Sequence, residues 1–247
     1  MNVGARDSSL PTVAVIIPAA GRGERYGGAL PKALEPINDV SLLAHVLATV
    51  TSVVEVSQVV VSAPVEFFSD VQSVCAQRCA LVGDEPVIDV VLGGPSRQES
   101  VANALAVVAD SVSIVLVHDA ARAFAPAQLF SAVIAAVERE NCAVVPGLPV
   151  ADTIKAIDDQ GDVVRTVDRA NLRSVQTPQG FPADLLRSVH ADADPNQAAT
   201  DDAGLVERSG VRVVVVDGHP EAFKVTTPFD ALLAQAVLAT REFNVDR

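Results

Sequence analysis

Short apolar runs alternate with longer helical segments through the first 145 residues, and this alternation constrains the fold more than any other feature. The apolar runs are bounded by polar or turn residues and span 12–17, 58–62, 88–92, 114–117 and 143–145. The segments between them have the length and patterning of helices and span 41–51, 64–79, 97–110 and 126–140. Strands that alternate with helices predict a mostly parallel sheet covered on both faces. The expected fold class is therefore α/β.

The composition agrees with such a fold and argues against several classes of protein. Hydrophobic residues make up 49% of the 247 residues, enough for one domain with a large core. The formal net charge of −13 argues against nucleic-acid binding, which needs a basic surface. No apolar run approaches the roughly 20 residues of a membrane span, and the first ten residues lack the apolar core of a signal peptide. We expect a cytoplasmic protein without nucleic-acid or membrane partners, with a flexible tail at 1–10 and a single domain at 11–247.

A glycine-rich, basic loop follows the first apolar run. It extends from Pro18 to Lys32 and includes Gly21, Gly23 and Arg25. Glycines let backbone N–H groups approach an anion closely, and the cations add donors in an otherwise acidic chain. The loop matches neither the Walker pattern nor the dinucleotide fingerprint. By itself it is compatible with either a solvated turn or a phosphate-binding site.

Asp119 lies just beyond the apolar run 114–117, in the sequence His118-Asp119-Ala120-Ala121-Arg122. Ligands in α/β sheets bind beyond the carboxyl ends of the strands, so Asp119 and the glycine-rich loop should share one edge. Mg²⁺ is usually held by one or two carboxylates together with the phosphates of a substrate. We therefore predict that Asp119 is a magnesium ligand, the alternative being a helix cap or a solvated charge. For His118 we expect a structural hydrogen-bonding role.

A second glycine pair, Gly93-Gly94, precedes a helix start of capping-box form, Ser96-Arg97-Gln98-Glu99. It lies between a predicted strand and a predicted helix, so its backbone N–H groups should face the same sheet edge. The alternative is an ordinary strand-to-helix turn.

The alternation breaks after Pro149. Residues 152–157 and 163–169 have strand character and flank the acidic, turn-rich segment 158–162, which predicts a protruding β-hairpin within about 150–175. Its exposed strand edges favour either a subunit-swapping arm or a lid. Further along, we expect a loop at 176–181, a polar helix start at Thr200-Asp201-Asp202, a strand at 211–217 and a helix after Thr227. Lys224 should point away from its apolar neighbours Phe223 and Val225.

A resemblance covers nearly the whole chain, from Val13 to Leu238. The motifs that carry it are Ala19-Ala20-Gly21-x-Gly23-x-Arg25, Pro31-Lys32, Gly94 with Arg97 and Ser100, Val117 to Arg122, Asp152 to Lys155, Thr166 to Arg169, Thr177-Pro178-Gln179, Thr200-Asp201-Asp202 and Lys224-Val225-Thr226. Together they resemble the 2-C-methyl-D-erythritol 4-phosphate cytidylyltransferase family of the non-mevalonate isoprenoid pathway. The resemblance implies a Rossmann-like nucleotidyltransferase fold and a homodimer interlocked through the β-arm.

The resemblance also implies a reaction and its residues. CMP would pass from CTP to methylerythritol phosphate with release of pyrophosphate, assisted by Mg²⁺ or another divalent cation on Asp119. Arg25 and Lys32 would stabilise the charge on the reacting phosphates, and Arg169 and Lys224 would hold the attacking phosphate. Thr153 and Thr177 would line the polyol pocket. The residues implied in nucleotide binding are Ala19, Ala20, Gly21, Gly23, Gly94, Ser100, Asp119 and Ala120.

Other functions remain open at this point. A ribitol-5-phosphate cytidylyltransferase would share the nucleotide loop and differ in the polyol pocket. A non-catalytic nucleotide-binding subunit would bind the nucleotide without turnover. Five charged residues retained together argue against it: Arg25, Lys32, Asp119, Arg169 and Lys224. A dehydrogenase would need the glycine fingerprint that this chain lacks.

Overall fold

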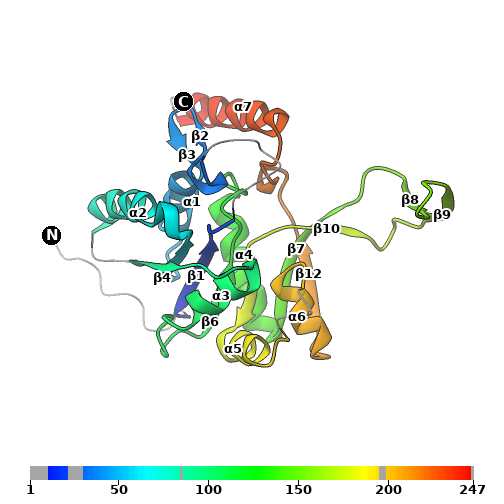
Figure 1. The fold of residues 1–247 in the computed structure, drawn as a ribbon, viewed down its shortest axis with the longest axis horizontal. Coiled ribbons are helices and arrows are strands. Elements are labelled where there is room, and N and C mark those ends of the chain that lie inside the picture. The colour runs from blue at the N-terminus through cyan, green and yellow to red at the C-terminus, as the bar shows by residue number, and fades with distance from the viewer. Residues whose placement is uncertain (1–10, 22–29, 84–85, 195–198, 246–247) are drawn as a thin grey trace.

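The computed structural model describes residues 11–21, 30–83, 86–194 and 199–245, arranged around one eight-stranded sheet (Figure 1). Its strands are β1 (Val13–Pro18), β4 (Val56–Ala63), β5 (Val87–Leu92), β6 (Ile114–Val117), β7 (Ala143–Pro149), β10 (Arg173–Val175), β11 (Gln179–Pro182) and β12 (Val213–Asp217). The strand order is β10-β7-β11-β6-β1-β4-β5, with β12 also paired to β7. The β6-β1-β4-β5 region is parallel, as is the β7–β12 pair. The predicted mostly parallel α/β fold is confirmed.

Helices cover both faces of this sheet. They are α1 (Leu42–Val50), α2 (Phe68–Val82), α3 (Arg97–Leu105), α4 (Ala127–Glu140), α5 (Ala183–Ala191), α6 (Asp202–Arg208) and α7 (Pro228–Val245), with 3₁₀ turns η1 (Lys32–Leu34), η2 (Val65–Phe67) and η3 (Pro220–Ala222) and a small hairpin of β2 (Pro36–Ile37) and β3 (Val40–Ser41). Strand β1 shows why two layers form. Val13, Val15 and Ile17 pack into the core with α1, α2, α4 and α7, whereas Ala14 and Ile16 pack into the core with α3, α5 and α6. Successive side chains of a strand point to opposite faces, so a wholly apolar strand needs cover on both.

Strand β11 corrects the sequence analysis, which predicts a loop at 176–181. Residues Gln179–Pro182 instead form a strand antiparallel to both β6 and β7. A Cβ atom on Gly180 would lie 2.6 Å from Cγ1 of Val133 on α4, so only glycine lets the strand run this close to the helix. The glycine that suggests a loop here instead allows close packing of the strand against α4.

Helix α3 ends at Leu105, five residues before the predicted end at 110. The side chain of Gln58 on β4 donates to the carbonyl oxygen of Val107 at 3.0 Å and accepts from the backbone N–H of Ala109 at 3.0 Å. These bonds satisfy backbone groups outside the helix, so the chain can leave helical geometry without losing hydrogen bonds.

The predicted hairpin is present as β8 (Ile154–Ile157) and β9 (Val163–Val167), a separate antiparallel pair that extends away from the central sheet (Figure 1). We call residues 150–175 the arm. Its apolar side chains Ile157, Val163 and Val164 are each at least 60% exposed. An isolated hairpin is marginally stable, and exposed apolar side chains on a strand edge are typical of a surface that meets a partner.

Two further expectations concern the ends of the chain and the membrane. The predicted tail at 1–10 lies outside the described residues. Within the described part of the chain, no helix has the combination of length and apolarity that crossing a bilayer requires.

Candidate active site

A pocket of about 880 Å³ lies at the carboxyl edge of the parallel strands. Its walls are the segments that follow β1 (18–21), β5 (93–97) and β6 (119–121), together with Lys32 and Lys224. The described ends of the glycine-rich loop, the second glycine pair and Asp119 therefore share one edge, as the sequence predicts. Gly23 and Arg25 lie outside the described residues.

Small residues form one wall of this pocket. A Cβ atom on Gly93 would lie 2.3 Å from Cβ of Ala20 and 3.1 Å from Oγ of Ser100, so the segments after β1 and β5 can meet only around a glycine. The backbone N–H of Gly94 donates to Oγ of Ser100 at 3.1 Å. Sequence reasoning placed the Gly93-Gly94 pair at this edge but counted only Gly94 and Ser100 among the nucleotide-binding residues. Ala20, Gly93, Gly94 and Ser100 all line the pocket.

The capping box at the start of α3 is confirmed. The backbone N–H of Glu99 donates to Oγ of Ser96 at 3.1 Å, and the backbone N–H of Ser96 donates to the Glu99 carboxylate at 3.0 Å. This cap fixes Arg97 as the first helical residue, with its side chain at the pocket.

Asp119 lies between two cations. Its Oδ2 accepts from Nζ of Lys224 at 2.8 Å, and its Oδ1 lies 3.5 Å from Nη2 of Arg97. The side chain is 14% exposed. Burial alone would raise the pKa of Asp119, but the charges of Arg97 and Lys224 outweigh it and lower that pKa to about 2. The carboxylate is therefore ionised at neutral pH.

Lys224 reaches Asp119 because its backbone is fixed against the segment after β6. The backbone N–H of Val225 donates to the carbonyl oxygen of Ala121 at 2.8 Å, and Nη1 of Arg122 donates to the carbonyl oxygen of Ala222 at 2.8 Å. Val225 is fully buried, whereas the Lys224 side chain is 43% exposed, which confirms their predicted opposite orientation. The segment is extended but lies outside the sheet.

His118 and Thr177 support Asp119 from behind the pocket wall. Oγ1 of Thr177 lies 3.1 Å from Nδ1 of His118 and accepts from the backbone N–H of Asp119 at 3.0 Å. Burial lowers the pKa of His118 to about 4, so the imidazole is neutral at pH 7. The predicted structural role of His118 agrees with these contacts. The Thr177 hydroxyl faces His118 and the Asp119 backbone, and Thr177 is 4% exposed. Its contact with the polyol stays a prediction.

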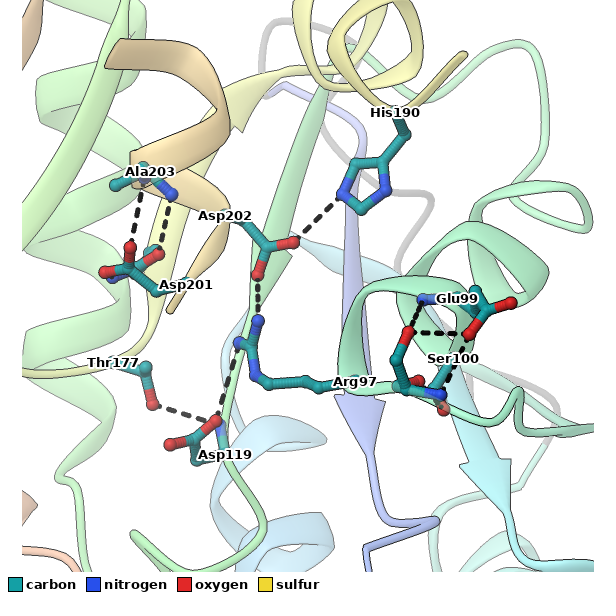
Figure 2. A network of polar contacts seen from close by, with 12 residues as sticks. Arg97, Glu99, Ser100, Asp119, Thr177, His190, Asp201, Asp202 and Ala203 are labelled. Atoms are coloured by element: carbon teal, nitrogen blue, oxygen red, sulfur yellow. Dashed lines mark hydrogen bonds and ion pairs between the residues drawn. The ribbon is translucent and has the colours of Figure 1, made fainter. Parts of the chain in front are cut away.

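A buried ion-pair network continues from Arg97 (Figure 2). Nη1 of Arg97 donates to Oδ2 of Asp202 at 2.6 Å, and Nε2 of His190 lies 2.9 Å from Oδ1 of Asp202. The predicted polar helix start is confirmed, because Asp201 caps α6 by accepting from the backbone N–H of Gly204 at 3.0 Å. Sequence reasoning missed the pairing of Arg97 with Asp202, since 105 residues separate them and no local pattern signals the contact.

The arm residues Thr153 and Arg169 do not join this pocket within the single chain. Both are exposed, and Nη1 of Arg169 donates to the carbonyl oxygen of Ala151 at the base of the arm. The pocket walls come from the edge of the central sheet, η1 and the segment of Lys224. The chain thus separates the predicted site residues into a group at the sheet edge and a group on the arm.

Asp119 is the candidate metal ligand of this pocket, and its surroundings determine which kind of metal site it can form. The described residues contain no group of three or more His, Cys, Asp or Glu side chains that could hold a metal ion. A single ionised carboxylate facing a large pocket suits a Mg²⁺ ion shared with the phosphates of a ligand rather than enclosed by protein ligands.

Comparisons with known proteins agree with this geometry. The model of a family described as 2-C-methyl-D-erythritol 4-phosphate cytidylyltransferase matches residues 13–240. A protein of that name from Saccharopolyspora erythraea is 50% identical over 232 residues, which cover 92% of this chain and 100% of the relative. One from Frankia casuarinae is 48% identical, covering 93% of this chain and 82% of the relative. The solved structure of the enzyme of that name from Thermus thermophilus superposes with a TM-score of 0.72 at 37% identity, covering 91% of this chain and 97% of that one.

Proposed function

The chain belongs to the 2-C-methyl-D-erythritol 4-phosphate cytidylyltransferase family, and from this premise we propose how its residues divide the work. The enzyme transfers CMP from CTP to 2-C-methyl-D-erythritol 4-phosphate, forming 4-diphosphocytidyl-2-C-methyl-D-erythritol and pyrophosphate. The observation that carries the proposal is the pocket that combines a small-residue wall with the charged groups of Lys32, Asp119 and Lys224.

The reaction needs positioning and charge neutralisation more than covalent chemistry. A phosphate oxygen of the second substrate attacks the α-phosphorus of CTP in line, and pyrophosphate leaves on the opposite side. Lys32, which lines the pocket, and Arg25 stabilise the negative charge that builds on the α-phosphate and the leaving group. Because the attacking group is already ionised, no general base is required.

The small-residue wall holds the nucleoside part of CTP. Gly93 lets the segments after β1 and β5 meet, and we assign the pyrimidine ring to the pocket surface lined by Ala20, Gly94 and Ser100. The residues of this half are Ala19, Ala20, Gly21, Gly23, Gly94, Ser100 and Ala120. Backbone groups offer both donors and acceptors to the base edge, and the Ser100 hydroxyl can do the same.

Asp119 would hold Mg²⁺ together with the phosphates of CTP, and a bound Mg²⁺ ion would supply positive charge that neutralises part of the charge on these phosphates. The Lys224–Asp119 ion pair opens when the substrates bind. Lys224 is the partner suited to move, because its long side chain is 43% exposed. It then holds the attacking phosphate.

We assign the other contacts to that phosphate and to its polyol to the arm. Arg169 and Thr153 lie outside the pocket of their own chain, and the arm exposes apolar side chains that favour a partner. A homodimer that exchanges arms would bring both residues to the pocket of the neighbouring subunit. Both substrates are phosphorylated metabolites, so we expect the enzyme to work in the cytoplasm.

Pyrophosphate release tests the proposed function. With CTP and Mg²⁺, the folded enzyme should release pyrophosphate with methylerythritol phosphate and far more slowly with ribitol 5-phosphate. Release with ribitol 5-phosphate but not with methylerythritol phosphate would replace the substrate assignment. No release with either polyol phosphate would contradict the proposal, provided that circular dichroism shows a folded protein.

A further inference from the structure

Each of the two cations beside Asp119 has a second anionic partner. For Lys224 that partner is the phosphate of the second substrate, as proposed above. For Arg97 it is Asp202, which belongs to the protein and is always present (Figure 2). The Arg97–Asp202 ion pair can therefore limit how closely Arg97 approaches Asp119.

Arg97 lies closer to Asp202 than to Asp119, as expected if Asp202 holds it in place. Nη1 lies 2.6 Å from Asp202, a full charge-assisted hydrogen bond, whereas Nη2 stands 3.5 Å from Asp119. The guanidinium is a rigid planar fork, so a bond that fixes one nitrogen also fixes the other. Asp202 thus sets the longer distance to Asp119.

Asp202 is well suited to anchor a cation. Its side chain is 1% exposed, and it accepts a second hydrogen bond from the buried His190 at 2.9 Å. Burial alone would raise the pKa of Asp202, but the hydrogen bond from His190 and the charge of Arg97 lower that pKa below its usual value. The anchor is therefore ionised and held in place from two sides.

Without this anchor Arg97 would turn to Asp119. Arg97 is the first residue of α3, where the helix dipole disfavours a cation, so nearby carboxylates are needed to stabilise its charge. Asp119 is the other carboxylate with which it makes an ion pair. A guanidinium that closed on Asp119 would occupy the oxygens that a metal ion needs.

We propose that Asp202 is a positioning residue that holds Arg97 away from Oδ1 of Asp119 and so keeps this oxygen open to the Mg²⁺–CTP complex. The inference rests on the proposed role of Asp119 and adds to it a residue outside the pocket. It predicts that loss of the Asp202 charge weakens metal–nucleotide binding because Arg97 closes on Asp119, and that removal of Arg97 reverses the defect.

Isothermal titration of Mg²⁺–CTP into the full-length protein, without the second substrate, tests this inference. Asp202→Asn keeps the size of the side chain and one acceptor but removes the charge, and it should raise Kd about tenfold. The double variant Arg97→Gln/Asp202→Asn has no guanidinium to close on Asp119, and its Kd should return toward the wild-type value. Metal-free CTP, titrated with a chelator present, should bind Asp202→Asn and wild type with similar Kd values.

Asp201→Asn is the matched control. It removes one charge at the adjacent residue, whose carboxylate bonds to Gln179 and Gly204, and asparagine still caps a helix. Its Kd should stay near wild type, and thermal melts of all variants check folding. Unchanged binding by Asp202→Asn, or a double variant as weak as the single one, would overturn the inference. A wild type that binds Mg²⁺–CTP but releases no pyrophosphate would instead contradict the proposed reaction.

Discussion

The pocket at the sheet edge and the β8–β9 arm carry the two halves of the proposed site, and the chain builds them in opposite ways. At the sheet edge, Asp119 is 14% exposed and is held by Lys224, Arg97 and the hydroxyl of Thr177. On the arm, Arg169 is exposed and bonds to the carbonyl oxygen of Ala151 at the arm's own base. The difference supports the proposal that one chain preorganises the nucleotide half and that a second chain completes the half assigned to the polyol phosphate.

The largest effect is expected at the sheet edge. Lys32→Ala removes a charge assigned to the transition state and should lower kcat on the order of 10³-fold, while the Kd of CTP changes little. Single-turnover kinetics and isothermal titration separate the two quantities. An unchanged kcat would remove Lys32 from the reaction.

An arm variant should show the complementary pattern. Arg169→Ala removes a contact to the attacking phosphate and should lower kcat/KM for methylerythritol phosphate on the order of 10²-fold. The Kd of Mg²⁺–CTP should remain as in wild type, because the arm is assigned no nucleotide contact. Weaker CTP binding in this variant would contradict the assignment of nucleotide binding to the sheet edge alone.

The buried His118 behind the pocket should make the stability of the metal-free protein decrease at acidic pH. The pKa of His118 is about 4 in the folded protein, against 6.5 for a free imidazole, so between these values the unfolded chain binds a proton that the folded chain does not. The stability contributed by neutral His118 is therefore complete above pH 6.5 and falls as the pH is lowered toward 4. We expect a loss of about 2 kcal/mol between pH 7 and pH 5.

Urea denaturation at a series of pH values measures this loss. His118→Gln keeps a hydrogen-bonding side chain that does not titrate, and its stability should depend less on pH in this range. An equally steep dependence in the variant would assign the acid sensitivity to other groups.

A matched pair of glycine substitutions gives the smallest expected effects. Gly93→Ala places a methyl group 2.3 Å from Cβ of Ala20 in the pocket wall and should weaken CTP binding about tenfold. Gly161 has a φ of +90° at the turn of the arm, with open space around it. Gly161→Ala should cost about 1 kcal/mol of backbone strain and leave CTP binding unchanged. Equal CTP affinities in the two variants would show that the wall tolerates the methyl group.

The same two regions show what sequence reasoning can predict. The edge position of Asp119 follows from a strand that ends in a carboxylate, and the arm follows from two strand-like runs around a turn. The pairing of Arg97 with Asp202 does not follow, because it depends on how α3 and α6 pack on the same face of the sheet. The loop predicted at 176–181 is a strand because Gly180 serves packing against α4, a context that local sequence does not contain.

The contribution of the arm to the neighbouring subunit is the central claim, and mixed dimers of Lys32→Ala and Arg169→Ala subunits test it most directly. If a site combines Lys32 of one chain with Arg169 of the other, one of the two sites in each mixed dimer is intact. A random equimolar mixture forms such dimers half the time, so pyrophosphate release should recover to about one quarter of the wild-type rate. Mixed dimers verified by mass spectrometry that remain as inactive as the two parent variants would contradict the shared site.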